Sequence, residues 1–172
     1  NSFFMCGIIG IMNQSPVAQD LYDGLTLLQH RGQDAAGMVT FDGKAIHLKK
    51  DVGLVQEIFH KGSMMRLKGY VGIGHTRYPT IGGVGVENAQ PFYFDMPYGV
   101  TMSQNGNCFN YYEVKEKIMA EALSRINSEC DVEGILHIFR STLIKQVQSH
   151  RNQFHLDFFW KGIKRVFQQL KG

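Results

Sequence analysis

The 172-residue sequence is poor in cysteine, in net charge and in long apolar runs. Its three cysteines, Cys6, Cys108 and Cys130, have no CxxC spacing and no paired histidines, which argues against a disulfide framework and against a metal site. A formal net charge of +3 is too small and too scattered to indicate a nucleic-acid partner. No stretch approaches the roughly 20 apolar residues that span a bilayer, so we expect no membrane partner. These absences predict a cytoplasmic protein in a reducing setting.

What is present fits one globular domain of ordinary size, with 44% hydrophobic and 19% charged residues. Residues 1–5 are too short for a signal peptide and begin without methionine, so we interpret them as a leader or a non-native remnant. The domain is therefore expected to cover residues 6–172. Hydrophobic periodicity and turn residues predict an α+β fold. We expect strands at 6–12, 38–41, 45–49, 69–75 and 99–103, helices at 17–30, 55–61, 111–125 and 132–147, and an amphipathic segment at 150–172.

Cys6 is the first candidate for chemistry. A cysteine in an apolar strand is more often a small core residue than a nucleophile. If the chain is trimmed so that Cys6 is its first residue, however, the thiol and a free α-amine share one residue. That amine, with a pKa of about 7.7 to 8.0, can act as the base for its own side chain.

Three further positions would suit a substrate that is an amino acid with a side-chain amide. The Asn105-Gly106 turn offers an amide NH2 and an unobstructed backbone N–H for an oxyanion, although Asn-Gly is also an ordinary β-turn. Arg77 ends a glycine-rich strand, where its planar fork could hold a carboxylate or simply face solvent. Asp131 could bind an ammonium group or only cap a helix. The joint occurrence of these groups indicates amide hydrolysis.

Four runs of sequence resemble the class II, N-terminal-nucleophile glutamine amidotransferases, and within them the amidophosphoribosyltransferase branch. They are Cys-Gly-Ile-Ile-Gly at 6–10, Leu-Gln-His-Arg-Gly-Gln-Asp-Ala-Ala-Gly at 28–37, Gly-His-Thr-Arg-Tyr-Pro-Thr at 74–80 and Glu-Asn-Ala-Gln-Pro-Phe at 87–92. The resemblance implies an N-terminal-nucleophile hydrolase with an αββα sandwich, which hydrolyses glutamine through a Cys6 thioester in the first step of purine nucleotide biosynthesis. Another class II amidotransferase is the alternative within the family.

Matched position by position, the resemblance also implies roles for individual residues. It makes Cys6 the nucleophile, Asn105 and Gly106 the oxyanion hole, Arg77 the carboxylate ligand and Asp131 the ammonium ligand. Arg31 and Thr76 are expected near the pocket, and a loop that starts at Tyr78 is expected to close over bound glutamine. No cofactor is implied for this chain. Mg and phosphoribosyl diphosphate are implied only for a phosphoribosyltransferase domain or subunit, the expected partner, which this chain does not contain.

Several departures from the family pattern keep a second hypothesis open. Gln104 stands where the family has histidine, and Val132 replaces a hydroxyl residue beside Asp131. The peptide bond from Met5 also acylates the Cys6 amine, so we expect little glutaminase activity from the chain as it stands. A non-catalytic glutamine-binding or assembly module is thus the alternative function. We further expect the sandwich to be incomplete at its C-terminal end, with edges that could pair in a homo-oligomer.

Overall fold

The computed structural model describes residues 5–78, 83, 85–120, 125–150, 153 and 155–171. The chain divides into two compact units. The first consists of Asn1–Phe92 and Thr101–Asn105, and the second consists of Tyr93–Val100 and Gly106–Gly172.

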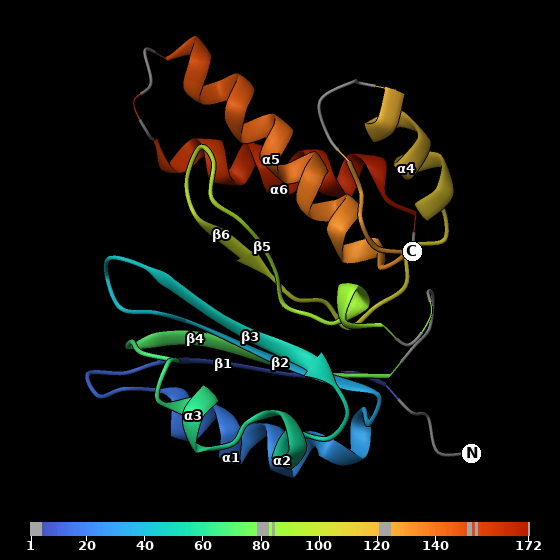
Figure 1. Cartoon of the computed structure of the whole chain (residues 1–172). Coiled ribbons are helices and arrows are strands. Elements are labelled where there is room, and N and C mark those ends of the chain that lie inside the picture. The colour runs from blue at the N-terminus through green and yellow to red at the C-terminus, as the bar shows by residue number, and fades with distance from the viewer. Residues whose placement is uncertain are drawn as a thin grey trace. The chain divides into compact units, whose positions relative to one another are not determined.

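The first unit is built on a four-stranded antiparallel sheet with the order β1-β4-β2-β3 (Figure 1). Its strands are β1 (Gly7–Met12), β2 (Ala35–Phe41), β3 (Ile46–Val52) and β4 (Val71–Arg77). All four predicted strands of this region are confirmed, and two of them, β2 and β3, are longer than predicted. Strand β4 continues two residues past the predicted end at residue 75, because Thr76 and Arg77 still pair with β1 and β2.

Helices cover one face of this sheet: α1 (Ala18–Leu28), α2 (Val55–Ile58) and α3 (Lys61–Met64) (Figure 1). Helix α1 places Leu21 and Leu25 one turn apart against the sheet, and both are fully buried. The single helix predicted over 55–61 is wrong in its extent. Phe59 has a non-helical backbone (φ −102°, ψ 72°) and is buried in the core, so the segment forms two short helices instead.

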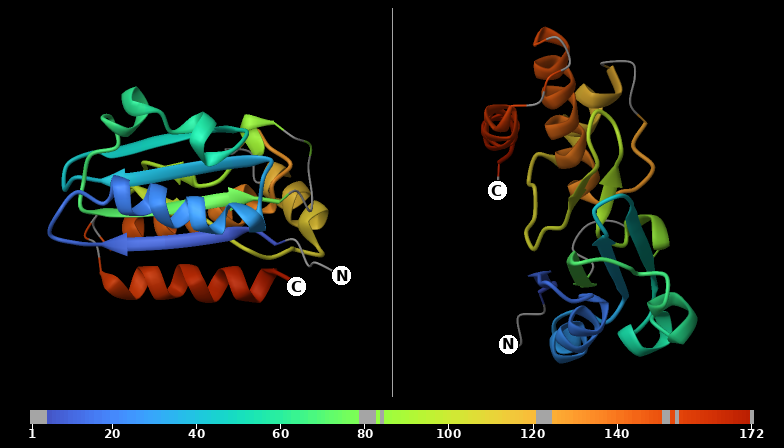
Figure 2. Two further views of the ribbon diagram at one scale, coloured as in Figure 1. Left: turned by 90° about the horizontal axis from the view of Figure 1, so that it is seen from below. Right: turned by 90° about the vertical axis from the view of Figure 1, so that its left-hand side faces the viewer.

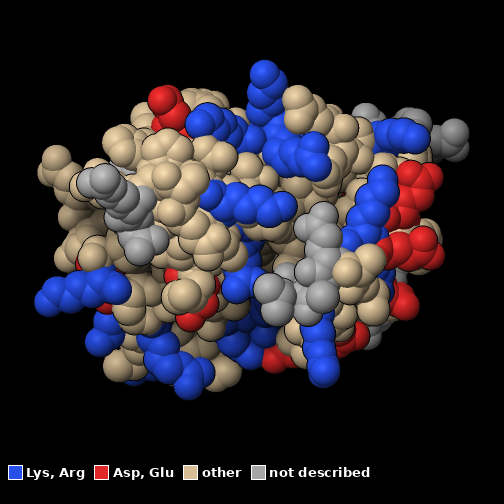
Figure 3. All heavy atoms as spheres, turned by 90° about the horizontal axis from the view of Figure 1, so that it is seen from above, with Lys and Arg blue, Asp and Glu red and all other residues tan. Residues whose placement is uncertain are grey.

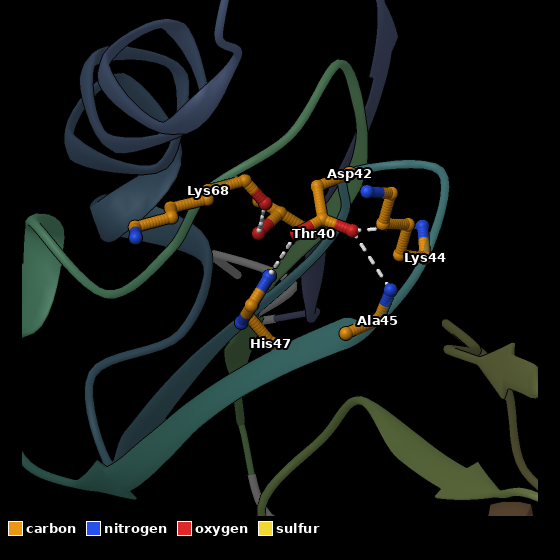
Figure 4. A network of polar contacts seen from close by, with 6 residues as sticks. All are labelled: Thr40, Asp42, Lys44, Ala45, His47 and Lys68. Atoms are coloured by element: carbon orange, nitrogen blue, oxygen red, sulfur yellow. Dashed lines mark hydrogen bonds and ion pairs between the residues drawn. The ribbon is translucent and has the colours of Figure 1, made fainter.

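The turn between β2 and β3 is a tight polar network, as the Asp-Gly pair at 42–43 predicts (Figure 4). Asp42 Oδ1 accepts the main-chain N–H groups of Lys44 at 2.8 Å and Ala45 at 2.7 Å, and Oδ2 lies 2.9 Å from His47 Nε2. The Ala45 N–H, followed by the His47 side chain, holds the pKa of Asp42 well below its usual range. Thr40 and Lys68 are joined next to this turn by a 2.7 Å hydrogen bond from Oγ1 to the carbonyl.

The second unit contains the helices α4 (Tyr111–Ala120), α5 (Asp131–Ser149) and α6 (Leu156–Gln169). Helices α5 and α6 lie side by side (Figures 1 and 2), and the rings of Phe139 and Phe159 meet edge to face at 5.4 Å. The predicted helix at 132–147 is confirmed, and the helix predicted at 111–125 is confirmed over 111–120, whereas the described residue 125 is not helical. The amphipathic segment forms α6.

A second, two-stranded sheet pairs β5 (Phe92–Phe94) with β6 (Val100–Met102). Strand β6 was expected within 99–103, whereas the three-residue β5 was not predicted. The α+β class is confirmed. Among the described residues, no helix is both long and apolar enough to cross a bilayer. On the face drawn in Figure 3, Lys and Arg side chains are scattered among uncharged ones.

Candidate functional site

Cys6 lies directly before β1, beside the last residues of β4. The antiparallel register pairs Gly7 with Thr76, and its extension by one residue sets Cys6 opposite Arg77. The main-chain N–H of Tyr78 donates to the Cys6 Sγ at 3.4 Å, and the thiol lies 3.5 Å from the Tyr78 carbonyl. Cys6 is buried, with 9% of its surface exposed. The sheet thus holds the sulfur at the end of β4.

Arg31 reaches Cys6 from the short helix η1 (Gln29–Arg31), which follows α1. Its Nε–H donates to the Cys6 carbonyl at 3.0 Å. The loop can approach β4 this closely because Gly32 has no side chain, since a Cβ there would lie 2.5 Å from the Arg77 carbonyl carbon. Gln29 fixes the same loop, donating to the Gly32 carbonyl at 2.6 Å and accepting the Val55 N–H at 2.7 Å.

Arg77 and Thr76 are both buried, but their side chains lie on opposite faces of β4. The Arg77 guanidinium donates to the Gly83 carbonyl at 3.2 Å, and the Asn88 side-chain amide donates to the same oxygen at 3.0 Å. Thr76 Oγ1 lies 3.4 Å from the Leu28 carbonyl, on the face covered by α1. A buried guanidinium close to Cys6 is suited to binding an anionic group.

Asn105 is exposed, and its position follows from the residue before it. The Gln104 carbonyl lies 3.2 Å from the His75 Nε2, and the Gln104 N–H donates to the Gln90 Oε1 at 2.7 Å. His75 is fully buried, and this burial lowers the pKa of its imidazole to about 4. His75 and Gln90 lie within the motifs at 74–80 and 87–92, but the sequence predicts no role for either residue. A histidine inside an otherwise apolar, glycine-rich strand was the available signal.

Asp131 and Gly106 belong to the second unit, where Asp131 is the first residue of α5. It is not the residue that caps the helix, since Cys130 occupies that position without a side-chain cap. The buried Asp131 carboxylate accepts the Cys108 N–H at 2.8 Å. Asp131 is thereby tied to the loop that begins at Gly106, and burial raises the pKa of the Cys108 thiol in that loop.

Glu133, in the first turn of α5, binds the chain segment that precedes this helix. Its carboxylate accepts the Ser128 N–H at 2.7 Å and the Ser128 hydroxyl at 2.5 Å. It also accepts the Asn127 N–H at 3.0 Å. Negative charge here suits the first turn of a helix, where main-chain N–H groups lack helical partners.

The structure therefore brings Cys6, Arg31, Arg77 and the Tyr78 main chain together in the first unit. In the second unit it brings Asp131 to the 106–108 loop. The loop expected to close over glutamine, at 78–86, lies largely outside the described residues. Among the residues that the structure describes, no group of three His, Cys, Asp or Glu side chains could hold a metal ion.

The fold and these side chains define an α+β protein with a buried thiol held at a sheet end beside two arginines. No family model matches the chain. It is nevertheless homologous to amidophosphoribosyltransferase over about 98% of its length. The relative from Haemophilus influenzae is 50% identical over 171 residues, and the relative from Pasteurella multocida is 46% identical over 171 residues. The relative from Escherichia coli is 49% identical over 140 residues, or 81% of the chain.

Solved structures agree with this homology. A glutamine phosphoribosylpyrophosphate amidotransferase from B. subtilis, complexed with ADP and GMP, matches with a TM-score of 0.79, 32% identity and 96% coverage of the chain. A structure described as the allosteric regulatory enzyme of purine biosynthesis matches with a TM-score of 0.80 and 33% identity. The chain spans about a third of the length of these relatives, 28% to 33% in the three sequences and 33% in both structures.

Proposed function

We propose that this chain is the glutamine-hydrolysing domain of an amidophosphoribosyltransferase, with Cys6 as its nucleophile once Cys6 is the first residue. The observation that carries this proposal is the set of contacts on residue 6. Its sulfur receives the Tyr78 N–H, and its carbonyl receives the Arg31 Nε–H. A cysteine whose sulfur and carbonyl both receive hydrogen bonds, beside a buried arginine, is better explained by chemistry than by packing, since packing alone requires neither bond.

The proposed reaction is nucleophilic acyl transfer. The α-amine of Cys6 takes the thiol proton, and the sulfur attacks the carboxamide carbon of glutamine. Asn105 Nδ2 and the Gly106 N–H stabilise the resulting oxyanion. The intermediate collapses when the amine returns its proton to the leaving nitrogen, so that ammonia departs and a thioester forms. Water then cleaves the thioester to glutamate and restores the thiol.

Recognition of the substrate is assigned to charged groups. Arg77 would bind the α-carboxylate of glutamine through its planar fork, and Asp131 would bind the α-ammonium. Arg31 would orient residue 6 through its carbonyl. Thr76 supports the same strand end from the other face of the sheet, and Tyr78 begins the loop over the substrate.

The wider parts of the proposal extend beyond this chain. They comprise an αββα sandwich of N-terminal-nucleophile type, a phosphoribosyltransferase domain or subunit as partner, and phosphoribosyl diphosphate with Mg as the requirements of that partner. The homology to amidophosphoribosyltransferase over 98% of the chain supports them. The proposal includes a cytoplasmic location, and the reduced thiols of Cys6, Cys108 and Cys130 fit a reducing compartment.

The proposal is tested by preparing the chain with Cys6 as its first residue and adding a diazo-ketone analogue of glutamine. The analogue should alkylate Cys6 alone, as mapped by peptide mass spectrometry, and excess glutamine should protect the thiol. Cys108 and Cys130 are internal controls, because both are buried and lie in the second unit. Labelling that glutamine does not slow would reject the proposal.

A second candidate is a glutamine-binding module without turnover. The observation that favours it is the Asp131 carboxylate, of which one oxygen already accepts the Cys108 N–H. Such a module would bind glutamine in calorimetry but release no ammonia when Cys6 is the first residue. Ammonia release that depends on Cys6 would reject the second candidate and retain the first.

A further inference from the structure

The main chain of Gln104 is held from both sides by side chains of the first unit. Its N–H donates to the Gln90 Oε1 at 2.7 Å, and its carbonyl lies 3.2 Å from the His75 Nε2. Both peptide groups next to the Gln104 Cα are therefore fixed. Asn105 is the next residue, so these two side chains fix the main-chain position from which the Asn105 side-chain amide extends.

The segment that carries Gln90 is itself tied to the sheet. Lys50 of β3 donates to the Ala89 carbonyl, and its ammonium lies 4.2 Å from the centre of the Phe92 ring. The Gln90 carbonyl occupies the space that a Cβ on Gly37 would need. Gly37 pairs with Lys50 on one side and with His75 on the other, so these contacts form one row across the sheet.

His75 connects this row to the strand end that holds Cys6. It pairs with Ile8 of β1, two residues after Cys6, and precedes Arg77 of β4 by two residues. Because its partner is a carbonyl, Nε2 must carry the ring proton. Burial keeps the imidazole neutral at pH 7, and Nδ1 contacts no polar partner within the described residues.

If position 75 served only to fill the core, it would not need an imidazole. Burying a polar side chain with only one of its two nitrogens bonded is costly, and a leucine or phenylalanine would fill the space without that cost. What histidine adds is a directed N–H aimed at the carbonyl that precedes Asn105. Gln90 adds a directed acceptor for the N–H of the same residue.

We infer that His75 and Gln90 are positioning residues that set the distance from the Asn105 amide to the Cys6 sulfur. The inference rests on the proposed function. His75 is anchored on the strand pair that also ends at Cys6, and Gln90 fixes the opposite side of the Gln104 peptide. Together they fix the position of the oxyanion donor relative to the nucleophile, although neither would touch the substrate.

The test uses the chain with Cys6 as its first residue and the substitutions His75→Leu and Gln90→Met, which remove the directed contacts at similar volume. A misplacement of about 1 Å can reduce a rate by roughly 10²-fold, so kcat for glutamine hydrolysis should fall by about that factor. The KM should change by less than about threefold, since Arg77 and Asp131 are untouched. His75→Gln, which keeps an amide N–H near the Nε2 position, should restore at least about tenfold of the loss.

A second measurement separates positioning from general damage. Iodoacetamide alkylates the Cys6 thiolate at a saturated carbon, so that reaction develops no oxyanion. Its rate should be the same in His75→Leu as in the unsubstituted chain, and the exposed histidine variant His60→Leu should be normal in both assays. An unchanged kcat in His75→Leu, an equal loss of kcat and alkylation, or no restoration by His75→Gln would each overturn the inference. Absence of glutamate release by the unsubstituted chain would instead overturn the proposed function, and this inference with it.

Discussion

The main-chain N–H of Tyr78 lies 3.4 Å from the sulfur of Cys6, although 72 residues separate the two along the chain. The antiparallel pairing of β1 with β4 creates this contact, because it sets the start of one strand beside the end of the other. An N–H aimed at sulfur stabilises negative charge there.

Arg77→Lys should weaken glutamine binding. Lysine keeps the charge but loses the planar fork, and a hydrogen bond to a charged group contributes about 1.5–3 kcal/mol, so KM should rise roughly 10- to 100-fold. The kcat should change much less. Steady-state kinetics with Cys6 as the first residue would measure both constants. Arg66→Lys, at an exposed arginine, is the control, and an equal effect of the two substitutions would contradict the prediction.

Arg31→Lys should lower kcat about tenfold, because lysine has no Nε–H to hold the Cys6 carbonyl. The KM should stay close to its original value, since the contact is to the enzyme's own main chain. Full activity in the substituted chain would show that the 3.0 Å bond does not orient the nucleophile.

Leu25→Ala should destabilise the first unit by about 2–5 kcal/mol, as expected when a large side chain is removed from a closed core. Leu25 is fully buried between α1 and the sheet. Leu27, on the same helix, is 78% exposed, and Leu27→Ala should change the free energy of unfolding by less than about 0.5 kcal/mol. Urea unfolding followed by circular dichroism compares the pair. Similar losses in both variants would be inconsistent with the packing described.

Stability should fall as the pH drops from 6.5 to 4. Burial lowers the pKa of His75 from 6.5 to about 4 in the folded chain, so the unfolded chain binds more protons in this window. The stability linked to His75 is fully present above pH 6.5, and its loss amounts to roughly 3 kcal/mol by pH 4.

Urea unfolding at pH 7 and pH 4.5 tests this dependence. His75→Gln should lose less stability than the unsubstituted chain over that interval, and the exposed variant His60→Gln should behave like the unsubstituted chain. Identical losses in His75→Gln and the unsubstituted chain would contradict the assignment to His75.

The regular strands and helices could be predicted from the sequence because alternation and helical periodicity are local. The run at 6–12 and the leucines of α1 gave the correct elements. Phe59 shows where this fails: its burial breaks a helix that the local pattern continues. The three-residue β5 carries too little pattern to be recognised, since its pairing with β6 is a tertiary contact.

The candidate site was predictable only as a set of residue types. Cys6, Arg31 and Arg77 were named from motifs, and the structure brings them to one strand end. The hydrogen bonds of His75 and Gln90 to Gln104 join residues that are 29 and 14 positions apart. No sequence spacing encodes such a contact, because it depends on how the 88–92 segment crosses the sheet.

The central claim is that the thiol and the free amine of residue 6 act together. Its most direct test is glutamate release from glutamine by two matched chains, one beginning at Cys6 and one retaining Met5 before it. The account predicts release by the first chain, loss of that release in its Cys6→Ala variant, and only background release by the second chain, whose amine is an amide. Equal release by both chains, or release that survives Cys6→Ala, would contradict it.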